Sequence, residues 1–293
     1  MNVTKVIWRG LSKSNRDVCL LASIGGNSKT SLVFELSLIP TAIIEAWDEY
    51  NADVDVRNQG VSYVHMLRAL VLLVAVCPEA CEFVQAGKGC YVQHNVQNAR
   101  QVARIIRDID SLPEPGLYMG ALAGMLKVAR ILGVSKVRSM VAGDACMIPP
   151  GVWTKVERAI LRRYALEFWL AYTHGWDGAP HLQATHVASV NSRDKALEAR
   201  GMDWSVFEVL DVGAPMSSQS ALCPGSKEFA NKRGFKIGCG SCPMACNAGA
   251  AKKWRAVVTH GNGDASRKAA ANRRGNNELM NERGQVKGLY VAA

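Results

Sequence analysis

Between Gly120 and Val212 the chain alternates apolar strand-like runs with amphipathic helix-like runs, and this alternation limits the possible folds more than any other feature. Strands that alternate with helices at this spacing are typical of βα units around a parallel sheet. We therefore expect an α/β fold with a partial or full parallel (βα) barrel. The predicted strands are 136–144, 166–175, 182–192 and 204–213, and the predicted helices are 121–133, 149–164 and 193–202.

The first forty residues have a different pattern, with three β-rich runs separated by Ser, Asn and Gly. They predict strands at 4–10, 17–26 and 30–40. Before the alternating region we also expect an amphipathic helix over 41–50, a strand that ends at Cys77, and a helix over 95–110. The predicted organisation is a β-rich N-terminal region (1–65), a barrel-like α/β core (66–212), a Cys-rich metal-binding segment (213–265) and a basic flexible tail (266–293).

The N-terminus lacks a basic stretch followed by an apolar run, so we expect no secretory signal and a cytoplasmic location. The most apolar run, Met66–Val76, has eleven residues. A bilayer span needs roughly 20, so we expect no membrane partner. Cytosolic thiols are kept reduced, so we do not expect the nine cysteines to form a disulfide framework.

The later group of cysteines has the spacing of metal ligands. Cys239 and Cys242 form a C-x2-C pair, Cys246 follows after three residues, and Cys223 is a candidate fourth ligand. Four thiolates close a tetrahedral site for zinc and also hold a cubane iron–sulfur cluster. Spacing alone leaves both metals open.

The earlier group contains three cysteines, Cys77, Cys81 and Cys90, followed by Tyr91. Three thiolates leave one metal position open, and an open position distinguishes a reactive metal site from a structural one. His94 is a possible fourth ligand that would close the site with zinc. A group without metal is the third alternative.

Two polar residues follow predicted strands of the parallel sheet. Asp144 ends the first strand, and His174 ends the next. The carboxyl ends of parallel strands are where active sites assemble in α/β barrels, so both are candidate catalytic residues. Asp144 could instead be a helix N-terminal charge, and His174 could be a base, a ligand or a packing residue. His186, within a predicted strand, is interpreted as a core histidine.

The formal charge of +10 is concentrated in the C-terminal tail. From Lys252 onward nine basic residues face three acidic ones, which accounts for six of the ten positive charges. A segment of this kind attracts polyanions, of which nucleic acid is the commonest in a cytoplasm. The alternative interpretation is a solvated, solubilising tail.

Several motifs occur together and in order: CPEACEFVQAGKGCY, VAGDACMIPPGVW, AYTHGW, ATHVASVNSRDKALEARGM, the final CP…CxxCxxxC and VVTHG. In this combination the chain resembles an uncharacterised family of bacteriophage cysteine-cluster proteins. The resemblance covers about residues 70–265. It implies an architecture and not a reaction.

That architecture is in turn distantly similar to radical S-adenosylmethionine enzymes, which hold a 4Fe-4S cluster through three cysteines with an aromatic neighbour. The similarity implies that Cys77, Cys81 and Cys90 hold the cluster, with Tyr91 beside it. It also implies that Gly143 and Asp144 bind the methionyl amine of S-adenosylmethionine, the Asp144 carboxylate taking the ammonium group. Asn191 corresponds to a cosubstrate-binding position on a later strand, and Thr173-His174-Gly175 to a Thr-Asn-Gly strand end.

These observations lead to one main hypothesis, an iron–sulfur enzyme that cleaves S-adenosylmethionine and acts on a nucleic acid or nucleotide, for example in DNA base modification. Cys223, Cys239, Cys242 and Cys246 would hold an auxiliary cluster or zinc. One alternative is a non-catalytic, zinc-stabilised nucleic-acid-binding protein. Another is a zinc-dependent base-modifying enzyme, although no H-x-E precedes a P-C-x2-C pair as it does in zinc deaminases.

Overall fold

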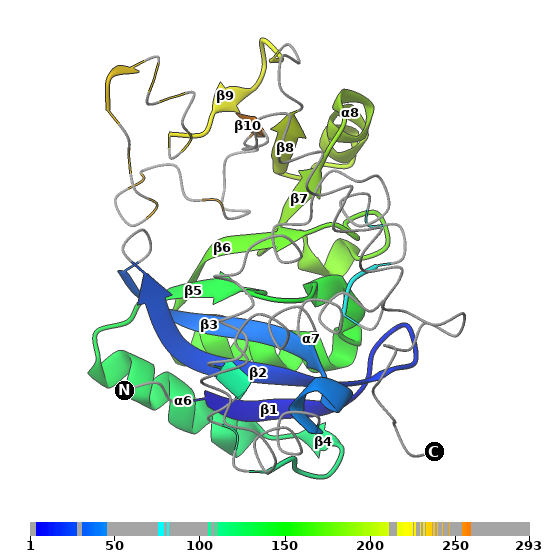
Figure 1. The fold of residues 1–293 in the computed structure, drawn as a ribbon, viewed down its shortest axis with the longest axis vertical. Coiled ribbons are helices and arrows are strands. Elements are labelled where there is room, and N and C mark those ends of the chain that lie inside the picture. The colour runs from blue at the N-terminus through cyan, green and yellow to red at the C-terminus, as the bar shows by residue number, and fades with distance from the viewer. Residues whose placement is uncertain are drawn as a thin grey trace, which may run out of the picture.

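The structure of the chain is a computed structural model (Figure 1). The residues that it describes are 4–27, 31–45, 76–78, 81, 105–106, 109, 111–210, 216–224, 226, 229, 231, 233–235, 237, 239, 242, 246 and 254–258. Within them the chain has a mixed α/β fold built on a largely parallel sheet, which confirms the predicted class.

The N-terminal part of the sheet is antiparallel. It consists of β1 (Thr4–Leu11), β2 (Asp17–Asn27) and β3 (Ser31–Pro40), and the short β4 (Gly116–Leu117) pairs with the outer edge of β1. The turn between β1 and β2 contains Asn15 in the left-handed conformation, with φ of 57°, which asparagine tolerates well. An ion pair of 2.8 Å between Arg9 and Asp17 joins the two strands beside this turn. All three predicted N-terminal strands are confirmed.

The remaining strands pair in parallel. They are β5 (Lys136–Ser139), β6 (Glu167–Thr173), β7 (Val187–Val190), β8 (Val206–Leu210), β9 (Ala221–Leu222) and β10 (Trp254–Val258). The whole sheet has the order β4-β1-β2-β3-β5-β6-β7-β8-β10-β9, and every pair from β3–β5 onward is parallel. The β-rich N-terminal strands therefore continue directly into the parallel sheet through β3 and β5.

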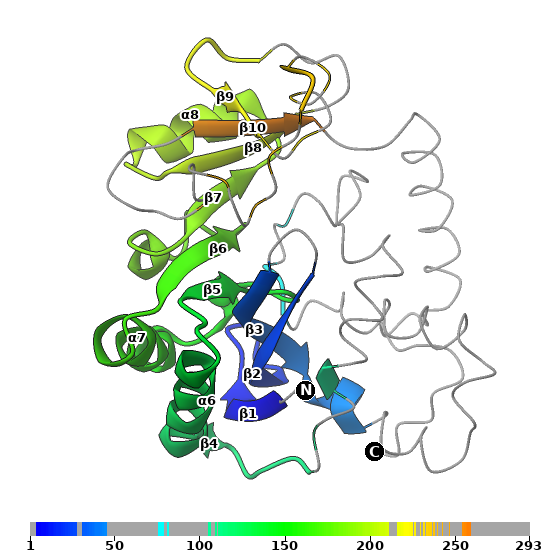
Figure 2. The same ribbon diagram turned by 90° about the vertical axis from the view of Figure 1, so that its left-hand side faces the viewer.

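Three helices connect these strands and lie on the same side of the sheet (Figure 2). They are α6 (Met119–Ile131), α7 (Pro150–Arg158) and α8 (Arg193–Gly201). Pro150 occupies the first position of α7, where the missing N–H is not needed. Ser192 caps α8 by accepting a hydrogen bond from the Lys195 backbone. After α7 the helix continues as a π-helical turn, Ala159–Arg163.

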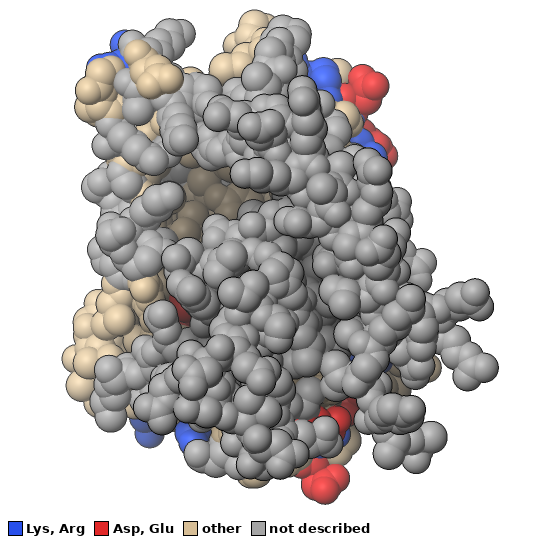
Figure 3. Space-filling model, viewed as in Figure 1, with Lys and Arg blue, Asp and Glu red and all other residues tan. Residues whose placement is uncertain are grey.

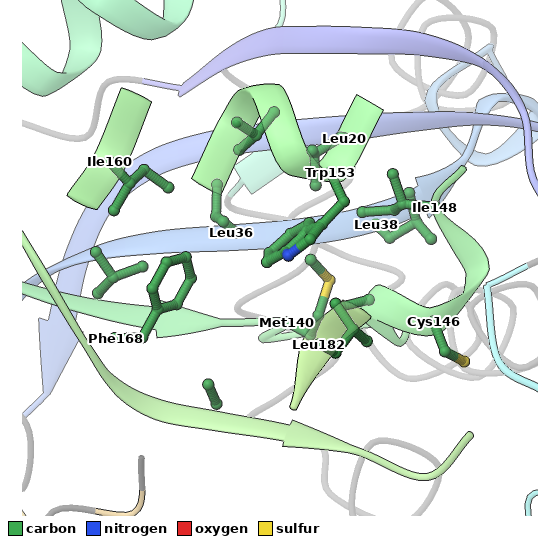
Figure 4. Close-up of a cluster of buried hydrophobic side chains, with 14 of the residues drawn as sticks. Leu20, Leu36, Leu38, Met140, Cys146, Ile148, Trp153, Ile160, Phe168 and Leu182 are labelled. Carbon is green, nitrogen blue, oxygen red and sulfur yellow. The ribbon is translucent and has the colours of Figure 1, made fainter. Parts of the chain in front are cut away.

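The main hydrophobic core lies between these helices and the sheet (Figure 4). Trp153 of α7 is fully buried at its centre, with its ring centroid 5.9 Å from that of Phe168 on β6. Its indole N–H donates to Glu157 over 3.0 Å, so the tryptophan is buried without an unsatisfied polar atom.

His186 belongs to the same core. Its Nε2 forms a hydrogen bond with the Ser139 hydroxyl at 2.9 Å, and its Nδ1 forms one with the Thr185 hydroxyl at 3.0 Å. The ring also packs edge-on against Trp153. Burial lowers the pKa of His186 to about 4, so the ring is neutral at neutral pH. The interpretation of His186 as a packing residue is confirmed.

The sheet changes its pairing partner along β6. The register with β5 shifts between Val137 and Arg138, whose partners are Phe168 and Leu170, so Trp169 is the extra residue of a β-bulge. β7 pairs only with the end of β6, at Tyr172 and Thr173. Below that point Leu170 forms an isolated parallel bridge with Cys246. Cys246 of the Cys-rich segment therefore pairs with β6 at Leu170, two residues before β6 starts to pair with β7 at Tyr172.

Some predicted elements differ from the structure or lie outside its described part. The strand predicted over 182–192 is limited to Val187–Val190 and follows a 3-10 turn, Pro180–Leu182. Residues 41–45 of the predicted 41–50 helix are helical. The strand before Cys77, most of the 95–110 helix and the 266–293 tail lie outside the described residues. Among the helices that the structure describes, none has the length and apolar character needed to cross a membrane.

Candidate functional site

The residues predicted to form a site on the parallel sheet lie at neighbouring strand ends. Asp144 follows β5, His174 follows β6 and Asn191 follows β7, and these three strands are adjacent and parallel. Their carboxyl ends therefore share one edge of the sheet. Asn191 is buried there, directly before the cap of α8.

The Asp144 carboxylate joins the ends of β5 and β6. Its Oδ1 accepts hydrogen bonds from the Cys146 backbone at 3.0 Å and from the Thr173 hydroxyl at 2.7 Å. Its Oδ2 accepts the His174 backbone N–H at 2.6 Å and faces His174 Nδ1 at 3.3 Å. Only 1 % of Asp144 is exposed. Both oxygens are therefore engaged by protein donors, and the carboxylate fixes the loop that carries His174.

Electrostatics favour the charged form of this buried carboxyl. Burial by itself raises the pKa of Asp144, but the hydrogen bond and charge of the His174 ring act in the opposite direction. The backbone N–H groups of His174 and Cys146 add to this effect, and together they hold the Asp144 pKa well below its usual range. Asp144 is thus a permanently ionised acceptor with a positioning role at the strand ends.

The first cysteine group is attached to the same strand ends. The Asp144 backbone N–H donates to the Val76 carbonyl over 2.6 Å, which places Cys77 directly beside the turn after β5. Cys77 is half-buried and Cys81 is buried, and the Cys81 N–H donates to the Pro78 carbonyl at 2.9 Å. Cys90, Tyr91 and His94 lie outside the described residues, so the structure gives no position for the third cysteine or the aromatic neighbour.

Two glycines make this close approach possible. Gly143 has a φ of +78°, and a Cβ there would lie 2.7 Å from the Leu38 carbonyl oxygen and 3.2 Å from the Val76 Cβ. At Gly175 a Cβ would lie 2.6 Å from the Cys146 sulfur and 3.5 Å from the Pro78 Cβ. Neither position has room for a side chain. Gly143, predicted to bind a cosubstrate, therefore has a clear packing function against β3.

Cys146 is the residue of this site that the sequence analysis missed. It is 3 % exposed and lies next to Asp144, Thr173 and Cys77, all of which affect its thiol. Burial and the Asp144 carboxylate raise the pKa of Cys146 far above its ordinary value, so it is a protonated thiol. Its only sequence signal was its position two residues after a strand-end aspartate.

The second cysteine group lies on the other face of the sheet from the helices. There Val33, Trp169 and Leu170 form a small cluster, against which Tyr172, Cys239 and Cys246 pack. Backbone hydrogen bonds attach the group to the sheet, from Ala171 to Cys246 at 3.3 Å and from Cys223 to Ala256 at 2.8 Å. A third bond, from Cys242 to Cys239 at 3.1 Å, forms the turn of the C-x2-C pair.

The four thiols of this group are neighbours in space. Burial raises the pKa of Cys246 to about 11, the Tyr172 hydroxyl lowers it through a hydrogen bond, and the nearby Cys223, Cys239 and Cys242 raise it further. The pKa of Tyr172 is raised by burial and by the same cysteines. The thiols of Cys246, Cys239 and Cys223 thus all act on the Tyr172 hydroxyl.

By residue type these side chains suit thiolate-bound metal. None of the eight cysteines that the structure describes forms a disulfide, and a set of four thiolates is the ligand set of both zinc and a cubane cluster. Among the described residues, which include all four cysteines of the second group, no three His, Cys, Asp or Glu side chains form a group that could hold a metal ion. For the first group the described donors are Cys77 and Cys81, with Cys90 as the third candidate.

On the side away from the helices, described Lys, Arg, Asp and Glu side chains are visible at the upper right and along the lower part of the molecule (Figure 3). Comparison of the chain with protein-family models, with curated proteins and with solved structures finds no match. The function must therefore be argued from the residues of the site itself.

Proposed function

We propose that this chain is an iron–sulfur enzyme similar to radical S-adenosylmethionine enzymes, with a 4Fe-4S cluster held by Cys77, Cys81 and Cys90. The observation that supports it best is the hydrogen bond from the Asp144 N–H to the Val76 carbonyl. This bond attaches the first cysteine to the carboxyl edge of a parallel sheet, where α/β enzymes assemble their active sites. Cys223, Cys239, Cys242 and Cys246 hold an auxiliary cluster or zinc in this proposal.

The proposed scaffold is a partial barrel with the Cys-rich segment as its C-terminal appendage. It is supported by the run of parallel pairs from β3 to β10 and by the location of α6, α7 and α8 on one side of the sheet. Such a sheet curves away from its helices. The opposite, inner side is the one on which Tyr172 and the second cysteine group lie.

Cys77, Cys81 and Cys90 would hold the cluster, which would supply one electron for the reductive cleavage of S-adenosylmethionine. The residues around it position groups and exclude water. Asp144 keeps its charge and holds the His174 backbone and ring. When the His174 ring is neutral, this contact favours the proton on Nδ1 and leaves Nε2 to hold or move a proton. The His174 side chain is 27 % exposed, so solvent or a substrate can reach it.

These contacts change the role proposed for Asp144. The resemblance implied that its carboxylate binds the ammonium group of S-adenosylmethionine. Because four protein contacts already occupy both oxygens, we assign Asp144 to positioning of the Thr173-His174 strand end. Asn191, buried at the neighbouring strand end, remains a proposed cosubstrate-binding residue.

The proposed substrate is a nucleic acid or nucleotide, with base modification as the reaction class. The support is the net charge of +10 and its concentration after Lys252. A bacteriophage origin, suggested by the family resemblance, agrees with such a role.

Anaerobic purification followed by metal analysis, visible absorption and electron paramagnetic resonance tests this proposal. We expect brown protein with iron and acid-labile sulfide, and release of 5′-deoxyadenosine from S-adenosylmethionine after reduction. Cys77→Ser should abolish this release while the iron of the second group remains. Colourless wild-type protein that stays free of iron after anaerobic reconstitution would refute the iron–sulfur proposal.

A zinc-stabilised nucleic-acid-binding protein is the second candidate, and one observation favours it. The second cysteine group provides four sulfurs, the number of protein ligands in a structural zinc site. One of them, Cys246, also forms a backbone bridge with Leu170 of β6. This alternative predicts stoichiometric zinc, no colour, and binding of nucleic acid that weakens steeply with salt. The same metal analysis separates it from the first proposal.

A further inference from the structure

The helical layer on the outer side of the sheet carries an unbalanced positive charge. Helices α6 and α7 and the π-helical turn after α7 lie next to each other in this layer (Figure 2). Their sequences contain a single acid, Glu157. They also contain six basic residues, which we call the basic helical surface: Lys127, Arg130, Lys155, Arg158, Arg162 and Arg163. All six side chains are exposed.

The fold brings the ends of the two helices together. Helix α6 leads into β5 and the π-helical turn leads into β6, and these two strands are parallel neighbours. The Glu167 N–H donates to the Ser135 carbonyl at 2.9 Å, which joins the segments that follow the two helix ends. Arg130 at the end of α6 and Arg162 and Arg163 in the turn therefore lie along the amino edge of the parallel strands. This edge is opposite to the one that carries the candidate site.

These cations have few opposite charges around them. In the described part of the chain no ion pair involves any of the six. Glu157 accepts the indole N–H of Trp153 at 3.0 Å, and Glu167 is exposed at the start of β6. Helix α8 differs, because Asp194 and Glu198 are exposed among its own basic residues. The excess of positive charge is therefore a local property of the α6–α7 part of the layer.

Interaction with the helix dipole explains only part of this pattern. Cations in the last turn of a helix are stabilising, which accounts for Arg162 and Arg163. Lys155 and Arg158 lie further back, and together with Arg162 they have the i, i+3 and i+7 spacing of one helix face. At 1.5 Å per residue this row is about 10 Å long. The π-helical turn adds Arg163 beside the row.

A row of cations with this length fits the phosphate backbone of a nucleic acid. The phosphates of one duplex strand follow each other at about 3.4 Å along the axis, so the row covers roughly three of them. Arginine predominates in the surface, and its planar guanidinium group binds two phosphate oxygens at once. Single strands are bound by stacking on aromatic side chains, but Trp153 is buried here and Tyr118 and Tyr164 are half-buried. The surface therefore suits the backbone of a duplex.

We propose that the basic helical surface binds the sugar–phosphate backbone of duplex DNA. The proposal rests on the proposed function for its substrate class, and it adds a surface that holds the substrate. This surface lies on the helical side of the sheet, away from the strand ends that carry Asp144 and His174. It contributes affinity and no chemistry, so binding and reaction should be separable by mutation.

Fluorescence anisotropy of a short, fluorescein-labelled DNA duplex measures the affinity of the full-length protein at several salt concentrations. We compare wild type with Arg162→Gln/Arg163→Gln and with Arg162→Lys/Arg163→Lys, which keeps both charges. The matched control, Arg16→Gln/Arg233→Gln, removes two exposed charges outside the helical layer. The difference from this control separates the basic helical surface from the rest of the positive charge. Iron content, release of 5′-deoxyadenosine without DNA, and the thermal unfolding temperature are recorded for each protein.

Loss of two phosphate contacts should reduce the slope of log K against log salt by about 1.8, because each contact contributes about 0.9. The same counterion release predicts that Arg162→Gln/Arg163→Gln weakens binding about 10- to 50-fold at about 0.1 M salt. The lysine variant should keep the wild-type slope, and the control should bind like wild type. Iron content and release of 5′-deoxyadenosine should not change in any variant.

A slope for Arg162→Gln/Arg163→Gln equal to that of the control would overturn the proposal. A lower unfolding temperature with unchanged DNA binding would assign the two arginines to the helix dipole alone and would overturn it as well. Wild-type protein that contains iron and cleaves S-adenosylmethionine but does not bind the duplex at low salt would refute this surface and leave the iron–sulfur proposal standing. Iron-free protein that binds the duplex through these arginines would have the reverse meaning.

Discussion

The backbone N–H of His174 donates a 2.6 Å hydrogen bond to Oδ2 of Asp144, and the two residues follow neighbouring strands of the sheet. The Asp144 carboxylate thereby connects the ends of β5 and β6, while the Asp144 backbone N–H separately holds the segment before Cys77. Two neighbouring strand ends thus meet at one buried anion. The stability of these strand ends should therefore depend on this carboxylate.

Replacement of Asp144 by Asn tests this dependence. Asn has nearly the same volume as Asp, but it carries no charge. Its NH₂ group would also face the N–H and O–H groups that donate to the Asp144 carboxylate, and it cannot accept their hydrogen bonds. Hydrogen bonds to a buried charged group contribute about 1.5–3 kcal/mol each, so we expect a loss of roughly 3 kcal/mol in the free energy of unfolding. Urea unfolding followed by circular dichroism measures it.

Asp177→Asn is the control for that variant. Asp177 is exposed, and among the described residues its carboxylate accepts a hydrogen bond only from the adjacent Gly178 N–H, at 2.8 Å. Its replacement should leave the unfolding midpoint unchanged. If Asp144→Asn unfolded at the same urea concentration as Asp177→Asn, the strand-end network would not have the importance assigned to it.

Alanine substitutions at Gly143 and Gly124 should change the free energy of unfolding in opposite directions. Gly143→Ala introduces a Cβ 2.7 Å from the Leu38 carbonyl oxygen and a side chain at a φ of +78°, so we expect destabilisation by about 2–4 kcal/mol. Gly124, within α6, has no atom within 4 Å of an added Cβ. There alanine should stabilise by about 0.5–1 kcal/mol. Thermal unfolding of both variants checks the pair, and a stable Gly143→Ala protein would contradict the close packing of β3 against the strand end.

Local sequence patterns predicted most of the fold because the elements carry their own signals. The three β-rich N-terminal runs became β1, β2 and β3, and the Pro149-Pro150 pair marks the start of α7. The β7 prediction was too long by five residues at its start. Thr185 and His186 form side-chain hydrogen bonds with each other and with Ser139, and these tertiary contacts replace strand pairing.

The site was less accessible to sequence reasoning because its contacts are long-range. Asp144 and His174 could be located at strand ends from the alternation alone. The approach of Cys146 to Cys77 depends on the absence of side chains at Gly143 and Gly175, which only the packed structure reveals. The bridge from Cys246 to Leu170 depends on the bulge at Trp169, for which the sequence has no marker.

His186 should make the protein less stable in mild acid. Its pKa is lowered from 6.5 to about 4 by burial. Between these values the unfolded chain binds a proton at this residue and the folded protein does not, so the free energy of unfolding falls as the pH falls. Above about pH 6.5 both states are neutral and the contribution is constant. The expected loss down to pH 4 is about 3 kcal/mol.

His186→Gln measures this contribution, since glutamine keeps hydrogen-bonding groups for Ser139 and Thr185 but does not titrate. Urea unfolding of both proteins at several pH values gives the two slopes. Other groups titrate in the same range, so the difference between the slopes is the relevant quantity. Parallel slopes for wild type and His186→Gln would show that this ring is not neutral in the folded protein.

The two cysteine groups should differ in what their loss does to the protein. Cys242 lies in the segment that pairs with β6 through Cys246, so Cys242→Ala should remove the metal of that group and lower the thermal unfolding temperature. Cys90 belongs to the proposed reactive centre, so Cys90→Ala should abolish release of 5′-deoxyadenosine and leave the unfolding temperature near that of wild type. Removal of metal by a chelator should reproduce both effects at once. Equal, mild effects of the two substitutions on stability and activity would contradict a division between one structural and one reactive centre.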